Sequence, residues 1–158
     1  MKRPVFVTAR PQPIPRWLEA FPDARVVPDA GADTDFSALA EASVVWLHMT
    51  TEHMDVTSHV LRVRRVAGSA PVVVLSNVPE DEQGLAALAA GASGYCSALT
   101  LPAVLRQVAG VVEHGGVWVG PQLMQRLMRG LASRSGTVPA SALDSLSQRE
   151  RQVAEAVA

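Results

Sequence analysis

The first residue that could do chemistry is His48, which ends the apolar run Val44–Leu47 and is followed within five residues by two threonines and a second histidine. Such a run is typical of a buried strand. Open α/β sheets place their functional groups just beyond the carboxyl ends of strands. His48 is therefore a candidate functional group, a candidate metal ligand, or a position from which a functional group has been lost.

Other residues could join His48 in a site, namely His53, His59 and Cys96. Their spacing matches no metal-binding motif, so we expect neither a metal nor a cofactor. A neutral, hydrogen-bonded imidazole is the favoured state of His48, with phosphorylation or pH sensing near its ordinary pKa of about 6.5 as alternatives. A single cysteine excludes an internal disulfide and suits a reducing compartment, and we expect Cys96 to be a small core residue.

Strands and helices alternate along the chain with short connections. Apolar, β-branched segments predict five strands, at 4–8, 24–27, 43–48, 71–77 and 93–97. Apolar residues at helical spacing predict helices within 14–21, 35–42, 55–68, 80–91 and 101–116. This alternation predicts an α/β protein with a doubly wound, five-stranded parallel sheet.

Two of these helices have clear buried and exposed faces. In the 55–68 helix the residues expected to face the core are Val56, Val60, Val63 and Val66. In the 101–116 helix the stripe expected to face the sheet comprises Leu101, Val104, Leu105, Val108 and Val112. The outward face of that second helix then carries Ala103, Gln107 and Gly110, which are small enough for close approach of another helix.

The C-terminal part has a different composition. A basic, Met-rich helix is predicted at 121–132 and a linker at 133–142, and no acid occurs between Glu113 and Asp144. Ser147 and Glu150 then form a capping box in front of an apolar run, which predicts a new helix. A lone helix has nothing to pack against, so we expect the chain to continue beyond residue 158.

Length and composition limit the class of protein. The chain has 158 residues, 48% of them apolar, and a net charge of −1, so it can bury a core but is not basic as a whole. No stretch approaches the length of a membrane span or of a signal peptide's apolar region. We therefore expect a cytoplasmic protein without a membrane partner.

Four segments resemble bacterial two-component response regulators with a LuxR-type helix-turn-helix output domain. "VVVLSN" and "AALAAGASGY" are similar to the fourth strand, fourth helix and fifth strand of a receiver domain of the flavodoxin-like type. "LPAVLRQVAGVVEHGGVWVGPQL" is similar to the fifth helix and its exit, and "LSQRERQVAEAVA" to the first helix of the output domain. The resemblance covers nearly the whole chain and is strongest at 71–125 and 146–158.

The resemblance also implies where receiver chemistry should lie, and most of its groups are missing. The acid pair that holds Mg²⁺ falls on Thr8 and Ala9, the phosphoacceptor aspartate on His48, and the phosphate-pairing lysine on Ala98. The positions that the family uses as switches are kept as Ser76 and Tyr95. Without carboxylates or lysine an aspartyl-phosphate mechanism cannot run. The resemblance thus implies an atypical, or pseudo-, receiver domain.

By the same resemblance, residues 1–118 are the pseudo-receiver, 119–145 the linker helix and linker, and 146–158 the first helix of a DNA-binding domain. The expected function is phosphorylation-independent transcription regulation, with the receiver-like part serving dimerisation and signal input. A homodimer is expected through the 80–91 and 101–114 helices, and DNA through the complete output domain. The recognition helix is absent, so Arg149 and Arg151 are expected to contact phosphate or solvent.

Three other classes compete with this interpretation. One is a ligand-sensing domain in which a pocket between Thr8, His48, Ser76 and Ala98 accepts a small molecule. Another is a scaffold that binds a regulator and never contacts DNA, which a stop codon after residue 158 would favour. An enzyme on a doubly wound fold is disfavoured, because the sequence has no glycine-rich phosphate loop, nucleophile elbow or carboxylate pair.

Overall fold

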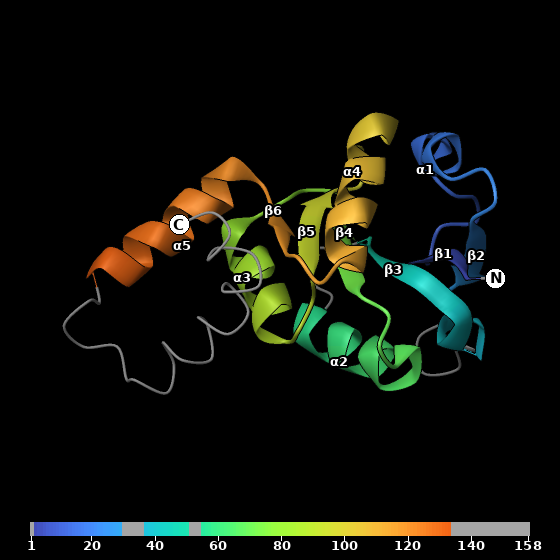
Figure 1. Cartoon of the computed structure of the whole chain (residues 1–158), viewed down its shortest axis with the longest axis horizontal. Coiled ribbons are helices and arrows are strands. Elements are labelled where there is room, and N and C mark those ends of the chain that lie inside the picture. The colour runs from blue at the N-terminus through green and yellow to red at the C-terminus, as the bar shows by residue number, and fades with distance from the viewer. Residues whose placement is uncertain (1, 30–36, 51–54, 134–158) are drawn as a thin grey trace. The chain divides into compact units, whose positions relative to one another are not determined.

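The computed structural model of the chain describes residues 2–29, 37–50 and 55–133 (Figure 1). The predicted linker after Ser133 and the predicted helix at 146–158 lie outside the described residues. The chain forms two compact units, Met1–Val119 and Gly120–Ala158. In the second unit the described element is the helix α5 (Pro121–Ser133).

A single parallel sheet forms the centre of the first unit. Its strands are β1 (Arg3–Thr8), β2 (Arg25–Pro28), β3 (Ala42–Met49), β4 (Val72–Ser76), β5 (Gly94–Ser97) and β6 (Trp118–Val119). They lie in the order β2-β1-β3-β4-β5-β6. The doubly wound α/β fold is thus confirmed, but the expected number of five strands was wrong. The sixth strand has two residues, too few for a recognisable strand pattern, and pairs with Gly94 and Tyr95.

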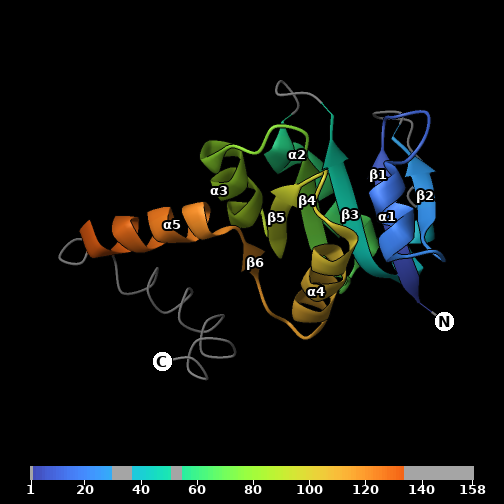
Figure 2. The same ribbon diagram turned by 90° about the horizontal axis from the view of Figure 1, so that it is seen from above.

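Helices cover both faces of the sheet (Figures 1 and 2). They are α1 (Pro15–Ala20), α2 (Val56–Ala67), α3 (Asp81–Ala89) and α4 (Pro102–Glu113). Helices α1 and α4 pack on one face and α2 and α3 on the other. Because the strands are buried on both faces, β4 reads as an unbroken apolar run rather than an alternating one.

Three local predictions need correction. The helix expected at 35–42 is a 3₁₀ helix, η2, at Ser37–Glu41, because Ala42 already pairs with β1 as the start of β3. Val66 is exposed, since the buried stripe of α2 continues to Ala67. Leu101 is 57% exposed because it is the N-cap of α4 and precedes its first turn.

No helix within the described ranges is long and apolar enough to cross a bilayer.

Candidate functional site

Four of the residues singled out in the sequence meet at the carboxyl edge of the sheet. Thr8 ends β1, His48 lies near the end of β3, and Ser76 ends β4. Ala98 follows β5, and its amide donates to the Ser76 carbonyl at 2.8 Å. Thr8, His48 and Ala98 are fully buried and Ser76 is 3% exposed. The fifth residue, Ala9, is exposed in the loop after β1.

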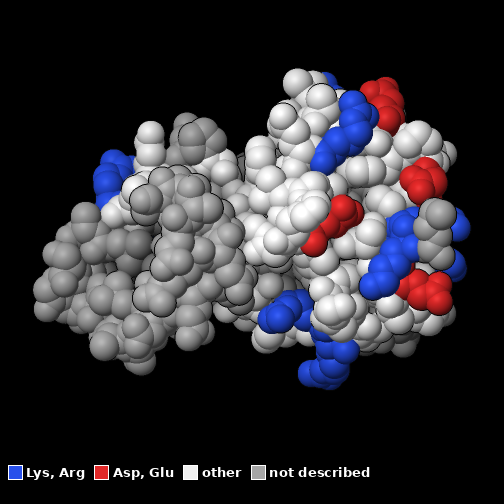
Figure 3. Space-filling view, in the orientation of Figure 1, with Lys and Arg blue, Asp and Glu red and all other residues white. Residues whose placement is uncertain are grey.

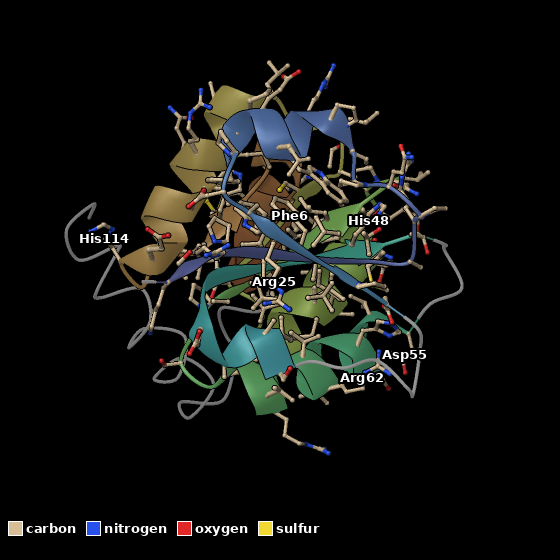
Figure 4. The ribbon with its side chains drawn as sticks, turned by 90° about the vertical axis from the view of Figure 1, so that its right-hand side faces the viewer. Phe6, Arg25, His48, Asp55, Arg62 and His114 are labelled. Carbon is tan, nitrogen blue, oxygen red and sulfur yellow. The ribbon has the colours of Figure 1, made fainter. Side chains whose placement is uncertain are left out.

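His48 is held by side chains from two neighbouring strand ends. Its Nδ1 lies 2.8 Å from Thr8 Oγ1 and its Nε2 lies 2.6 Å from Asn77 Oδ1. Figure 4 shows His48 at the tip of β3, on the opposite side of the sheet from Arg62 of α2. The imidazole therefore connects the loops that follow β1 and β4.

The partners of Asn77 decide which nitrogen of His48 carries the proton. The Thr50 carbonyl can only accept, so the Asn77 amide nitrogen, 3.2 Å away, must face it. The Asn77 oxygen then faces Nε2, which must be the donor. Nδ1 accepts from the Thr8 hydroxyl, whose oxygen accepts from the Arg10 backbone N–H at 3.1 Å. Four hydrogen bonds thus run in one direction, from the Arg10 N–H through Thr8, His48 and Asn77 to the Thr50 carbonyl. Both nitrogens of a neutral imidazole then have a hydrogen-bond partner.

The surroundings of His48 keep it neutral. Burial lowers the pKa of His48 below its usual range. The Asn77 hydrogen bond raises this pKa by less, and the nearby Arg10 charge lowers it slightly further. In the neutral tautomer only Nδ1 has a lone pair, and the Thr8 hydroxyl occupies it. A phosphoryl group or a metal at His48 would have to displace one of these partners.

Trp17 of α1 fills the space beside this network, and nothing in the sequence marked it. Its ring meets the imidazole edge-on, with centroids 5.0 Å apart, and stacks on Phe6 at 4.8 Å. Its indole N–H donates to the Ala98 carbonyl at 3.0 Å. The pocket expected between Thr8, His48, Ser76 and Ala98 is therefore closed, which corrects that alternative. Loss of charged groups suggested an empty space, but an aromatic ring occupies it.

A small cavity does lie beside Ser76, at the ends of β3 and β4. It has a volume of about 40 Å³ and is lined by Met49, Thr50, Ser76, Asn77, Val78, Glu80 and Gln83. Of the predicted pocket residues, this lining includes Ser76 alone. Asn77 belongs both to this wall and to the His48 network.

Tyr95 is buried and fixed by two hydrogen bonds. Its hydroxyl accepts from the Glu80 backbone N–H at 2.9 Å and donates to Gln83 Oε1 at 2.7 Å. Tyr95 thereby supports the start of α3, while its own backbone pairs with Val119 of β6. The Tyr95 side chain thus links β5 to Glu80 and Gln83, which line the cavity.

Of the remaining candidates, His53 lies outside the described residues, whereas His59 and Cys96 are described. No group of three or more His, Cys, Asp or Glu side chains among the described residues could hold a metal ion. Burial raises the pKa of the Cys96 thiol to about 11, so it is protonated and a poor nucleophile. His59 Nε2 lies 3.4 Å from Asp29 Oδ2.

The outward face of α4 is as expected from the sequence. Ala103, Gln107 and Gly110 are exposed, whereas Leu105 and Val108 are fully buried.

The comparison with known proteins identifies the fold. No protein-family model and no curated protein sequence matches the chain. Among solved structures, a LuxR-family two-component response regulator from Aurantimonas sp. superposes with a TM-score of 0.59 and 22% identity, over 82% of this chain and 97% of that one. The chain has the receiver fold.

Two further receiver structures agree with this assignment. A LuxR-family DNA-binding response regulator from Silicibacter pomeroyi gives a TM-score of 0.51 and 20% identity, over 77% of this chain and 99% of that one. The isolated receiver domain of RcsB from Salmonella enterica gives a TM-score of 0.55 and 16% identity, over 78% of this chain and 96% of that one. At these identities the likeness is one of fold. At the carboxyl edge of the sheet in this receiver fold, Thr8, His48 and Ala98 are fully buried and none of them is charged.

Proposed function

We propose that this chain is the receiver-like part of a DNA-binding transcription regulator that works without phosphorylation. The observation that carries the proposal is the closed network at His48, where the resemblance places a phosphoacceptor aspartate. A neutral imidazole with both nitrogens hydrogen-bonded offers no carboxylate to attack a phosphoryl group. The similar solved structures include LuxR-family response regulators, which supports a regulatory rather than an enzymatic role.

The positions around His48 also lack the acid pair and the lysine that phosphoryl transfer in receiver domains uses. Mg²⁺ needs hard oxygen ligands, and Thr8 offers one hydroxyl that is already used twice. Ala98 ends in a methyl group, so the negative charge of a phosphate would find no lysine there. Trp17 covers the remaining space. We infer that the edge is held in one state by side-chain hydrogen bonds.

The proposed regulator is a constitutive homodimer, because a reader of two DNA half-sites needs a two-fold partner and phosphorylation is not available to trigger pairing. We place the interface on α3 and on the outward residues of α4, Ala103, Gln107 and Gly110. A Cβ atom built at Gly110 meets nothing within 4 Å, so a side chain there points away from the domain's own core.

Sedimentation at tens of micromolar, about the range for a standard-sized interface, tests this dimer. Gly110→Arg should shift the population to monomers without destabilising the fold, because Gly110 lies in a helix and a side chain there meets nothing. Leu61→Arg on α2, which is also exposed, is the matched control and should leave the dimer intact. A wild-type monomer would contradict the dimer, and an unchanged dimer in Gly110→Arg would move the interface elsewhere, with the Met-rich helix α5 as the next candidate.

DNA binding is proposed for the segment that begins at 146 and for the helix-turn-helix expected to follow it. Residues 1–118 would then be the pseudo-receiver and 119–145 the linker. On the face of the first unit shown in Figure 3, basic and acidic side chains are interspersed, which does not favour DNA binding there. The test is DNA binding by the full-length protein with and without acetyl phosphate. Equal affinities are expected, and a phosphodonor-dependent gain would refute the proposal.

A further inference from the structure

Helix α4 carries two exposed residues of opposite charge that have no partner among the described residues. Neither Arg106 nor Glu113 makes an ion pair or a side-chain hydrogen bond there. They are seven residues apart, so they lie on nearly the same side of the helix and about 10 Å apart along its axis. Side chains of one helix pair at a spacing of three or four residues. A second copy of the helix can bring these two charges together.

The outward side of α4 consists of a stripe between two different flanks. The exposed residues of the stripe recur at spacings of four, three and four, and they are Ala103, Gln107, Gly110 and His114. Helical geometry places Arg106 and Glu113 on one flank of this stripe. The half-buried Val104 and Val111 lie on the other flank. One flank is therefore charged and the other is apolar.

These flanks distinguish between the two directions in which two copies of α4 could pair about a two-fold axis. In a parallel pair each flank faces the opposite flank of the partner helix, so the charged side chains would face valines. In an antiparallel pair each flank faces the same flank of the partner helix. Opposite charges then meet on one side, and valines meet on the other. The distribution of charge on α4 favours the antiparallel pair.

We infer that two copies of the chain pair through antiparallel α4 helices, with Arg106 of each copy bound to Glu113 of the partner subunit. This inference rests on the homodimer proposed above and gives that dimer an orientation. Two-fold symmetry makes the ion pair twice, because a contact from one residue to a second implies the reciprocal contact. The partner is thus a second copy of this chain, selected by complementary charge.

The stripe between the flanks fits the same register. With the two-fold axis near the middle of α4, Ala103 faces His114 of the partner subunit. Gly110 then faces Gln107 of the partner subunit. Each small residue meets a larger one, which allows the two helices to approach closely. A Cβ atom built at Gly110 meets nothing within 4 Å in its own chain, so the space in front of Gly110 is open.

The antiparallel arrangement separates the segments that follow α4 in the two copies. Helix α4 has 12 residues and is therefore about 18 Å long. Its C-terminal end leads to β6 and α5, and the two C-terminal ends lie at opposite ends of the helix pair. Separate exits suit a regulator that reads two DNA half-sites about 34 Å apart.

Charge reversal, followed by sedimentation equilibrium of the chain, tests the ion pairs. Arg106→Glu and Glu113→Arg each place like charges opposite one another twice, so each should raise the dissociation constant of the dimer by about tenfold. The double variant restores both pairs and should return the dissociation constant to within about threefold of the wild-type value. Arg65→Glu reverses an exposed charge on α2 and should dimerise like the wild type.

Oxidative cross-linking tests the direction of the helices. A chain with both Ala103→Cys and His114→Cys should form disulfide-linked dimers. Ala103→Cys alone should not, because its two copies would be about 16 Å apart along an antiparallel pair. The wild-type chain, which has Cys96, is the control for cross-linking through the native thiol.

Cross-linking of Ala103→Cys alone would overturn the inference while leaving the homodimer in place. The same holds if the double charge variant dimerises as weakly as the single variants, or if all charge variants dimerise like the wild type. A monomeric wild-type chain would overturn the inference together with the homodimer. None of these results bears on phosphorylation, which has its own test.

Discussion

The hydrogen bond between Thr8 and His48 makes a prediction that can be measured as a double-mutant cycle. His48→Leu removes the acceptor of the Thr8 hydroxyl, which is fully buried and cannot turn to water. The Thr8 oxygen still accepts from the Arg10 N–H, but a buried donor left without an acceptor costs about 1–3 kcal/mol. The other former partner, Asn77, is exposed and can bond water, so it adds little. We expect His48→Leu to lower the free energy of unfolding by about 2 kcal/mol.

Thr8→Val causes the complementary defect. It leaves the Nδ1 lone pair of His48 without a donor, again in a fully buried position, at a similar cost of about 2 kcal/mol. The Arg10 backbone N–H loses its acceptor too, but Arg10 is exposed and water replaces it. In the double variant neither position holds a stranded polar atom. The double variant should therefore be more stable than the sum of the two single losses by about 2 kcal/mol.

Urea unfolding followed by tryptophan fluorescence provides the four free energies, provided that all variants have the same m value. The control cycle combines His48→Leu with Ser58→Ala on α2, whose hydroxyl bonds to Asp55 and shares no partner with His48. That cycle should be additive to within about 0.5 kcal/mol. If the Thr8–His48 cycle were equally additive, the buried network described above would not exist.

Three further predictions concern single groups. The pKa of His48 is lowered in the folded protein, so the stabilisation that neutral His48 provides is present above about pH 6.5 and is lost as pH falls through the folded pKa. The melting temperature should therefore fall with pH in this range in wild type and not in His48→Leu. Burial raises the pKa of Cys96 from 9.0 to about 11. Alkylation of Cys96 at pH 8 should therefore be about 100-fold slower in the native chain than in the urea-unfolded chain, and equal rates would refute this prediction. Gly91→Ala should cost about 1–3 kcal/mol in urea unfolding, because φ of 106° is rarely adopted by a residue with a Cβ atom. Gly110→Ala, in a helix, should instead stabilise by up to about 1 kcal/mol.

The sequence predicted the fold because its signals are local. Buried parallel strands such as β4 show as unbroken β-branched runs, and α2 and α4 show their apolar stripes at helical spacing. The edge of the sheet that gathers Thr8, His48 and Ser76 follows from strand order alone. Local patterns could not reveal β6, since two residues carry no periodicity and their pairing with Gly94 depends on the completed sheet.

The side chains that surround His48 could not be predicted from the sequence, because their positions depend on tertiary packing. Trp17 lies on a six-residue helix in a proline-rich region, and only the packing of α1 against α4 directs its indole to the Ala98 carbonyl. Asn77, the last residue of the strand predicted at 71–77, was not singled out; the signal that could have found it is a polar side chain at the end of a buried strand. Its role as the partner that fixes the His48 tautomer required the position of the Thr50 carbonyl. The sequence showed which charged groups are missing between Thr8, His48 and Ala98, but it could not show that the Trp17 ring fills the space that they would occupy.

The most direct test of the central claim is exposure of the chain to acetyl phosphate, and separately to beryllofluoride, in the presence of Mg²⁺. Intact mass and tryptophan fluorescence report the outcome, and one of the three tryptophans, Trp17, contacts His48. We predict no added phosphoryl mass and no saturable spectral change. His48→Asp should behave in the same way, because Thr8, Ala9 and Ala98 still provide no metal ligands and no cation. A saturable mass increase or fluorescence change in the wild-type chain would contradict the proposal that this receiver fold works without phosphorylation.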